Sequence, residues 1–125
     1  MDAISILIVD DDELLCDMVA SLLELEGHMV TVAHDGAAGL AYCREGAFDC
    51  ILLDLVMPRM DGLQFMREIS RVLPDHPPIV VMSASVTAGI VEEGRDYGVR
   101  SMIRKPVDAE KLLGAITQAT APGGG

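Results

Sequence analysis

Four short runs of aliphatic residues in this chain each end in polar side chains, and this pattern constrains the fold more than any other feature. The polar residues at the ends of the runs are Asp10 with Asp11, Asp54, Ser83 and Lys105. Runs of this length, rich in β-branched residues, are typical of strands buried on both faces of a parallel sheet. Because open α/β sheets bind ligands at the carboxyl ends of their strands, we expect all five polar side chains at one edge.

The segments between these runs repeat apolar residues at helical spacing, which favours alternating strands and helices. Apolar residues from Leu14 to Leu23 form one wide stripe, and Gly27 stands where a helix end often needs a left-handed residue. A soft, short helix is expected over 86–97, because Gly89 and Gly94 each cost about 1 kcal/mol relative to Ala. The predicted strands cover 4–9, 29–33, 50–53, 79–83 and 102–104, and further helices are predicted over 36–44, over 63–73 and after Asp108 as N-cap.

Five strands alternating with five helices predict an α/β fold, in which a parallel sheet carries helices on both faces. Parallel strands need right-handed helical crossovers, and this requirement sets the layering. Both common doubly wound strand orders fit the pattern. The flavodoxin-like order 2-1-3-4-5 places the first and third strands side by side, which would bring Asp10 and Asp11 next to Asp54.

Composition narrows the class of protein. The chain has 125 residues, half of them apolar, which suits one domain with a core of ordinary size. Nine basic against 20 acidic residues give a net charge of −11, which opposes direct binding to nucleic acid or to an anionic membrane surface. No apolar run approaches the ~18 residues of a membrane span, and the N-terminus lacks signal-peptide features. We therefore expect a cytoplasmic protein.

The cysteines and histidines show no ligand pattern. Neither disulfide-framework nor zinc-site spacing is present, so we expect buried, free thiols at Cys16, Cys43 and Cys50. Surface or loop positions are expected for His28, His34 and His76.

A cluster of three carboxylates at one sheet edge needs a cation. Two carboxylates about 4 Å apart repel by about 4 kcal/mol at an effective dielectric constant near 20. Hard oxygen ligands in small number suit Mg²⁺, which keeps several waters and accepts phosphate oxygens. Taken alone, the acidic run starting at Asp10 also fits a solvated helix start, and Ser83 or Lys105 fits an ordinary strand end. Their convergence on one edge favours a site for a cation and a phosphoryl group.

These motifs resemble those of the receiver domains of two-component response regulators, over essentially the whole chain up to its glycine tail. The matching segments, in order, are Ile8-Val9-Asp10-Asp11-Asp12, Leu53-Asp54-Leu55-Val56-Met57-Pro58 with Met60-Asp61-Gly62, Met82-Ser83-Ala84 and Arg104-Lys105-Pro106. The resemblance implies a flavodoxin-like fold in which Asp54 is the phosphoacceptor. Its phosphoryl group would come from a phosphohistidine on a partner histidine kinase or histidine phosphotransfer protein.

The resemblance also implies the remaining site roles. Mg²⁺ would be bound by Asp11, Asp54 and the backbone carbonyl of Val56, and Asp10 would act largely through coordinated water. Lys105 would pair with one phosphoryl oxygen and Ser83 would donate a hydrogen bond to another. The Lys105-Pro106 peptide bond is typically cis in this family, so we expect it to be cis here. Such a domain is a signalling phosphoacceptor that promotes only its own phosphorylation and dephosphorylation.

Signal output is expected to begin at Ser83. When its hydroxyl is drawn toward a phosphoryl group, the loop 84–88 and the soft helix 86–97 would move, switching the face of the fourth helix, fifth strand and fifth helix. Here the sequence departs from the family, because Met102 stands where an aromatic residue usually rotates inward. We predict weaker or differently routed coupling. The resemblance implies that Val56 and Ser85 lie near the path of hydrolytic water. The domain is expected to be a monomer or a phosphorylation-dependent dimer.

We expect residues 1–120 to form the receiver domain, and residues 121–125 to be a flexible glycine-rich tail or the start of a linker. Two alternatives are weighed against this interpretation. One is a pseudo-receiver, a binding module that keeps the fold without the chemistry. The other resembles the haloacid-dehalogenase phosphatases, in which Asp10 would be the nucleophile and Asp12 the acid.

Overall fold

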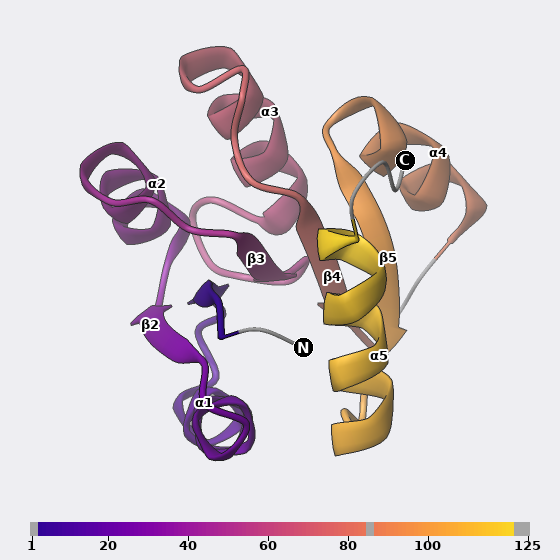
Figure 1. Ribbon diagram of the computed structural model, residues 1–125. Coiled ribbons are helices and arrows are strands. Elements are labelled where there is room, and N and C mark those ends of the chain that lie inside the picture. Colours follow the sequence, from indigo (N-terminus) through magenta and orange to yellow (C-terminus); the bar gives the residue numbers. More distant parts are fainter. Residues whose placement is uncertain (1–2, 85–86, 122–125) are drawn as a thin grey trace.

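A computed structural model describes residues 3–84 and 87–121 of the chain, and within them five strands alternate with five helices (Figure 1). The strands are β1 (Ser5–Val9), β2 (Met29–Ala33), β3 (Cys50–Asp54), β4 (Ile79–Ser83) and β5 (Val99–Arg104). The helices are α1 (Glu13–Leu25), α2 (Gly36–Glu45), α3 (Gly62–Val72), α4 (Ala88–Asp96) and α5 (Ala109–Thr120).

All strand pairs are parallel, and the order is β2-β1-β3-β4-β5. The predicted α/β class and flavodoxin-like strand order are confirmed. Val9 at the end of β1 is in register with Leu53 in β3, so the residues that follow Val9 and Leu53 meet at one edge. The strands β3 and β4 are buried along their whole length, as continuous aliphatic runs predict.

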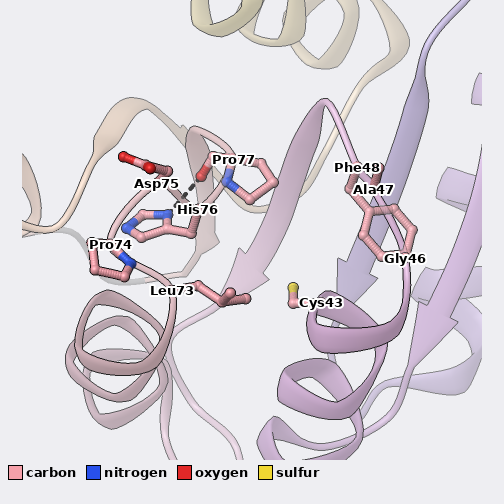
Figure 2. Close-up of a pocket in the computed structure, with 9 residues that line it drawn as sticks. All are labelled: Cys43, Gly46, Ala47, Phe48, Leu73, Pro74, Asp75, His76 and Pro77. Atoms are coloured by element: carbon pink, nitrogen blue, oxygen red, sulfur yellow. Dashed lines mark hydrogen bonds between the residues drawn. The ribbon is translucent and has the colours of Figure 1, made fainter.

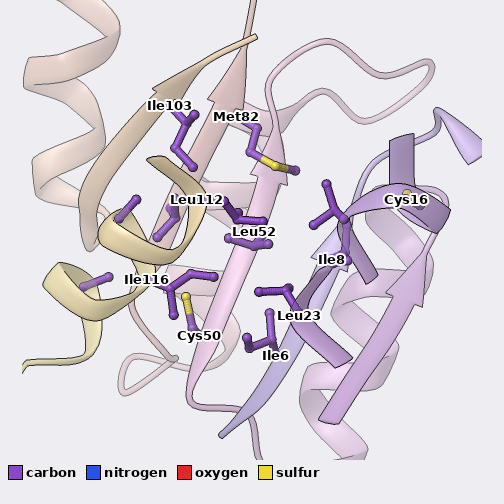
Figure 3. Close-up of a cluster of buried hydrophobic side chains, with 14 residues drawn as sticks. Ile6, Ile8, Cys16, Leu23, Cys50, Leu52, Met82, Ile103, Leu112 and Ile116 are labelled. Carbon is purple, nitrogen blue, oxygen red and sulfur yellow. The ribbon is translucent and has the colours of Figure 1, made fainter. Parts of the chain in front are cut away.

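Two apolar clusters hold helices against the two faces of the sheet. On one face, side chains from β1, β3 and β4 pack against α1 and α5, with Ile8, Leu23 and Leu112 among the buried residues (Figure 3). On the other face, α2 and α3 pack through residues that include Leu40 and Phe65. These clusters fix the ends of the strands, and therefore the site at those ends, relative to one another.

Side chains cap every helix start. In each case the N-cap side chain accepts a hydrogen bond from the backbone N–H three residues later, which satisfies a donor that the helix leaves free. The N-cap residues are Asp12, Asp35, Asp61, Thr87 and Asp108. The expected N-cap at Asp108 is confirmed, and Asp12 shows that part of the acidic run serves α1.

Several predicted boundaries need correction. The fifth strand begins at Val99, three residues before the predicted start, because Val99 pairs with Ile79 before a register shift in β4 and β5. His28 lies in the loop between α1 and β2, within the expected surface or loop placement, but it is buried there, and its Nδ1 accepts a hydrogen bond from the Ile4 N–H at 3.1 Å. Helix α4 begins at Ala88, whereas the predicted start at 86 lies outside the described residues.

Other expectations on composition hold. All three cysteines are free and buried. No helix within 3–84 or 87–121 has the length and apolar character that a membrane span requires.

Candidate functional site

Three carboxylates meet where β1 and β3 end. Asp10 and Asp11 follow β1, Asp54 is the last residue of β3, and one oxygen from each lies within 4.8 Å of the others. Asp10 and Asp54 are buried, whereas Asp11 is exposed at the rim. The predicted juxtaposition of these residues is confirmed, and its physical cause is the adjacency of β1 and β3 in the sheet.

Lys105, which follows β5, reaches two of these carboxylates. Its Nζ lies 3.2 Å from Asp10 Oδ2 and 3.4 Å from Asp54 Oδ1. The backbone holds the lysine in place, since the Lys105 N–H donates to the Ser83 carbonyl at 2.9 Å. The Lys105-Pro106 peptide bond is cis, as predicted. One ammonium therefore faces the buried pair of carboxylates.

Both carboxylate oxygens of Asp10 accept hydrogen bonds. Oδ1 accepts from the Asp12 N–H at 2.9 Å, and Oδ2 accepts from Lys105. The residue is wholly buried, and its backbone N–H donates to the Ala33 carbonyl in β2. A carboxylate held in this way has little freedom to move, and both of its oxygens already serve as acceptors.

The electrostatics of the site oppose the ionised form of Asp54. Burial raises the pKa of Asp54 above its ordinary value of 3.8, and the nearby charge of Asp10 raises it further. Lys105 and a hydrogen bond from the Val56 backbone work in the opposite direction without reversing the shift. Burial lowers the pKa of Lys105, but the charges of Asp10 and Asp54 outweigh it and leave the pKa raised. The cluster thus carries more negative charge than its own lysine balances.

The loop after β3 holds the backbone of Asp54 tightly. A Cβ at Gly62 would lie 2.5 Å from the Asp54 carbonyl oxygen and 2.7 Å from the Leu55 Cα, so only glycine fits there. The Gly62 N–H donates to the Leu55 carbonyl, which closes the loop. Arg59 in this loop adopts a left-handed backbone with φ of 67°, and Val56 is 74% exposed. The backbone of Asp54 is therefore fixed by the turn that starts α3.

Ser83 and Met102 occupy the two strands on the far side of the cluster. Ser83 ends β4, where it is buried and in register with Arg104. Met102 is half-buried in β5 and pairs in register with Val81. Its Cε lies 3.5 Å from the position of a Cβ built on Gly94 of α4. The predicted switch residues therefore lie in β4 and β5, and Met102 lies beside α4. Ser85, in the predicted water path, lies outside the described residues.

One residue beside the site carried no signal in the sequence. His34 follows β2, is exposed as expected, and places its Nδ1 3.3 Å from the Asp10 carbonyl oxygen. A lone histidine without a partner at ligand spacing has no pattern to detect. Only the strand order β2-β1-β3 brings it to the acidic edge.

The donor set fits a hard divalent cation. Three carboxylate oxygens within 4.8 Å of one another, one of the carboxylates exposed at the rim, leave room for water and for a phosphate oxygen. Nitrogen and sulfur ligands of the kind that zinc prefers are absent from this cluster within the described residues. The residues therefore match the coordination preferences of Mg²⁺.

A pocket of about 320 Å³ lies elsewhere on the molecule, between the ends of α2 and α3 (Figure 2). Its lining includes Cys43, Phe48 and Leu73, together with the loop that leads into β4. That loop is at the amino ends of the strands, opposite the carboxylate cluster. His76 in this loop is already bonded to the Ser70 hydroxyl and the Pro77 carbonyl. The pocket is therefore separate from the acidic site.

Comparison with known proteins shows to which family this chain belongs. The model of the response regulator receiver domain matches residues 6–117. The chain belongs to the response regulator receiver domain family. The receiver domain is 33% identical over 119 residues to the transcriptional regulatory protein YkoG of Bacillus subtilis, covering 95% of this chain and 52% of that protein. It is 36% identical over 111 residues to the response regulator ArlR of Staphylococcus saprophyticus, covering 89% and 50%.

Solved structures agree with this assignment. The chemotaxis protein CheY4 of Vibrio cholerae superposes on the receiver domain with a TM-score of 0.87, at 28% identity, covering 94% of this chain and 99% of that one. The resemblance read from the sequence motifs is thus confirmed, and the chain is a receiver domain of two-component response regulators. It spans about half the length of the two regulators named above.

Proposed function

We propose that this receiver domain accepts a phosphoryl group on Asp54 from the phosphohistidine of a partner kinase or phosphotransfer protein, and that it uses Mg²⁺ to do so. The observation that carries the proposal is the carboxylate cluster with Lys105 at its side. Asp11, Asp54 and the Val56 carbonyl would hold the ion, and Asp10 would act through coordinated water. When bound, Mg²⁺ neutralises the charge on the phosphoryl oxygens and on the attacking carboxylate.

In this proposal, Asp54 and Lys105 have different roles in phosphoryl transfer. A carboxylate oxygen of Asp54 forms the new bond to phosphorus while the bond from phosphorus to the histidine nitrogen of the donor breaks. Lys105 is close enough to pair with an oxygen of the arriving group, because it already lies 3.4 Å from Asp54 Oδ1. Phosphoryl transfer depends mainly on positioning and charge neutralisation, and these residues supply both.

The same geometry argues against a phosphatase that uses Asp10 as its nucleophile. Asp10 is wholly buried, and its two carboxylate oxygens accept hydrogen bonds from the Asp12 N–H and from Lys105. Asp12 caps α1 through its side chain and so has a structural role. A nucleophile needs an oxygen that a phosphorus atom can approach, and Asp54 at the strand end meets this requirement better.

The test is incubation of the chain with acetyl phosphate, a small acyl phosphate, and Mg²⁺, followed by mass spectrometry and peptide mapping. We expect one added phosphoryl group on Asp54, lost on addition of a chelator before the donor. Asp54→Asn should abolish the adduct, whereas Asp75→Asn, an exposed substitution at the opposite edge, should leave it intact. Phosphate on Asp10 would favour the phosphatase alternative. Absence of any adduct together with absence of Mg²⁺ binding would favour a pseudo-receiver.

Exposed apolar side chains around the site support docking of a protein donor. Leu14 on α1 is 83% exposed, Met18 one turn later is 42% exposed, and Val56 stands beyond Asp54 on the other side. Apolar residues exposed together on a soluble domain mark interaction surfaces. We infer that the partner kinase or phosphotransfer protein contacts them, and that Leu14→Ser should slow transfer from the partner but not from acetyl phosphate.

The wider context is part of the same proposal. We propose residues 1–120 as the receiver domain and 121–125 as a flexible tail or the start of a linker. A cytoplasmic location agrees with three free, buried thiols. The net charge of −11 disfavours direct contact of this domain with nucleic acid. We propose a monomer or a dimer that forms through α4 and α5 on phosphorylation, and size-exclusion chromatography with and without acetyl phosphate distinguishes them.

A further inference from the structure

Two side chains from different elements converge on the backbone carbonyl of Asp10. The Cys16 thiol, from the first turns of α1, donates to this oxygen over 3.3 Å. The His34 Nδ1, from the loop between β2 and α2, lies 3.3 Å from the same oxygen. A carbonyl oxygen has two lone pairs, so this pair of donors occupies it fully. A thiol is a weak donor, and His34 therefore supplies the stronger of the two bonds.

This carbonyl belongs to the peptide that joins Asp10 to Asp11. The Asp10 carboxylate is fixed independently, by the Asp12 N–H and by Lys105. Asp11 differs, because it is exposed at the rim of the cluster. Rotation of the peptide between the two residues would swing the Asp11 carboxylate relative to Asp54. A restraint on the Asp10 carbonyl is thus a restraint on the direction of Asp11.

We propose that His34 is a positioning residue of the acidic site, which donates from Nδ1 to the Asp10 carbonyl and so aims Asp11 at the cation. The proposal rests on the proposed function, because it assigns His34 a role in Mg²⁺ binding at that site. A carbonyl only accepts hydrogen bonds, so the contact requires the proton on Nδ1. His34 itself is not a ligand in this proposal. It acts through the peptide backbone, as groups behind metal ligands do in other metal sites.

The exposed position of His34 makes the test clean. His34→Ala removes the donor from a loop side chain and leaves the apolar core untouched. His34→Asn is the matched control, because the asparagine amide nitrogen occupies the place of Nδ1 and can donate to the same carbonyl. Both variants are measured beside the wild-type chain for Mg²⁺ affinity by calorimetry, for the phosphorylation rate with acetyl phosphate, and for thermal unfolding without metal.

We expect His34→Ala to weaken Mg²⁺ binding about two- to tenfold, the range that one net hydrogen bond supports. The phosphorylation rate at subsaturating Mg²⁺ should fall by a similar factor and recover at saturating Mg²⁺. His34→Asn should restore the affinity. Nuclear magnetic resonance of the metal-free wild type should show the His34 proton on Nδ1, and the Asp10 carbonyl carbon should shift in the Ala variant but not in the Asn variant.

The outcomes separate this proposal from the one on which it rests. If the wild type binds Mg²⁺ and is phosphorylated on Asp54, but His34→Ala matches it in affinity, the positioning role is refuted and the proposed function stands. The same holds if His34→Asn fails to restore the affinity, or if the His34 proton resides on Nε2. If the wild type neither binds Mg²⁺ nor takes up phosphate, both proposals fall together.

Discussion

Replacement of Asp54 by asparagine should stabilise the metal-free protein, although it destroys the proposed phosphoacceptor. Oxygens of Asp10 and Asp11 lie within 4.8 Å of the Asp54 carboxylate. At an effective dielectric constant of about 20, each of these two repulsions amounts to at least about 3.5 kcal/mol. The attraction between Lys105 and Asp54 Oδ1, which lie 3.4 Å apart, offsets about 5 kcal/mol of this repulsion. Screening at the exposed Asp11 lowers the net repulsion, so we expect a gain of about 1 to 2 kcal/mol.

The pH dependence of this gain follows from the direction of the Asp54 pKa. Burial and the charge of Asp10 raise the pKa in the folded chain above 3.8, so the folded chain binds a proton at this carboxyl more readily than the unfolded chain does. The ionised carboxyl therefore destabilises the fold at pH values above its folded pKa. As the pH falls through the folded pKa toward 3.8, wild-type Asp54 becomes protonated and the advantage of Asp54→Asn should disappear.

Urea unfolding of the metal-free chain at a series of pH values measures this prediction. At pH 7 the free energy of unfolding of Asp54→Asn should exceed that of the wild type by about 1 to 2 kcal/mol. Added Mg²⁺ should stabilise the wild type by about 1.4 kcal/mol at ten times its dissociation constant, and should stabilise the variant much less. Glu24→Gln, which removes one exposed negative charge from α1, controls for the net charge of −11. Equal stability of Asp54→Asn and wild type at pH 7 would show that the cluster is not under electrostatic strain.

Three further substitutions and one control test the loop, the lysine and the switch. Gly62→Ala should destabilise the fold by about 2 kcal/mol or more in urea unfolding, because its Cβ meets backbone atoms, whereas Gly114→Ala, with open space around its Cβ, should stabilise α5 by about 0.5 to 1 kcal/mol. Lys105→Gln should cost about 2 kcal/mol at pH 7, a cost that shrinks as the pH falls and Asp54 is protonated; a constant cost across pH would refute the ion-pair explanation. Met102→Tyr should enlarge the amide shift changes that phosphorylation causes in α4, and an unchanged response would count against the predicted weak coupling.

Most of the fold could be predicted from local patterns in the sequence. The aliphatic runs of β3 and β4 are buried along their length, and they were recognisable because a strand covered on both faces has no polar alternation. The exact ends of the strands and helices were harder to predict. The start of β5 at Val99 depends on its pairing with Ile79, which is a tertiary contact that no local pattern contains. The burial of His28 within its loop could not be predicted for the same reason, since the Ile4 N–H that donates to it lies far away in the chain.

The residues of the candidate site could be predicted from the sequence, but their geometry could not. Asp10, Asp54 and Lys105 were predictable because each follows an aliphatic run, and the ends of parallel strands share an edge. The distances among them, the salt bridges of Lys105 and the raised pKa of Asp54 required the assembled sheet. His34 was invisible in the sequence, because only the placement of β2 beside β1 brings its ring to the Asp10 carbonyl.

The sequence by itself determined the alternation of strands and helices, the edge at which the polar residues gather and the excess of negative charge there, because these follow from residue order and side-chain chemistry. Only the tertiary structure decided which carboxylates are buried, which of them the lysine pairs with and which neighbours hold their backbone in place. Those properties depend on distances of a few ångströms between residues far apart in the chain, and packing of the whole domain sets such distances.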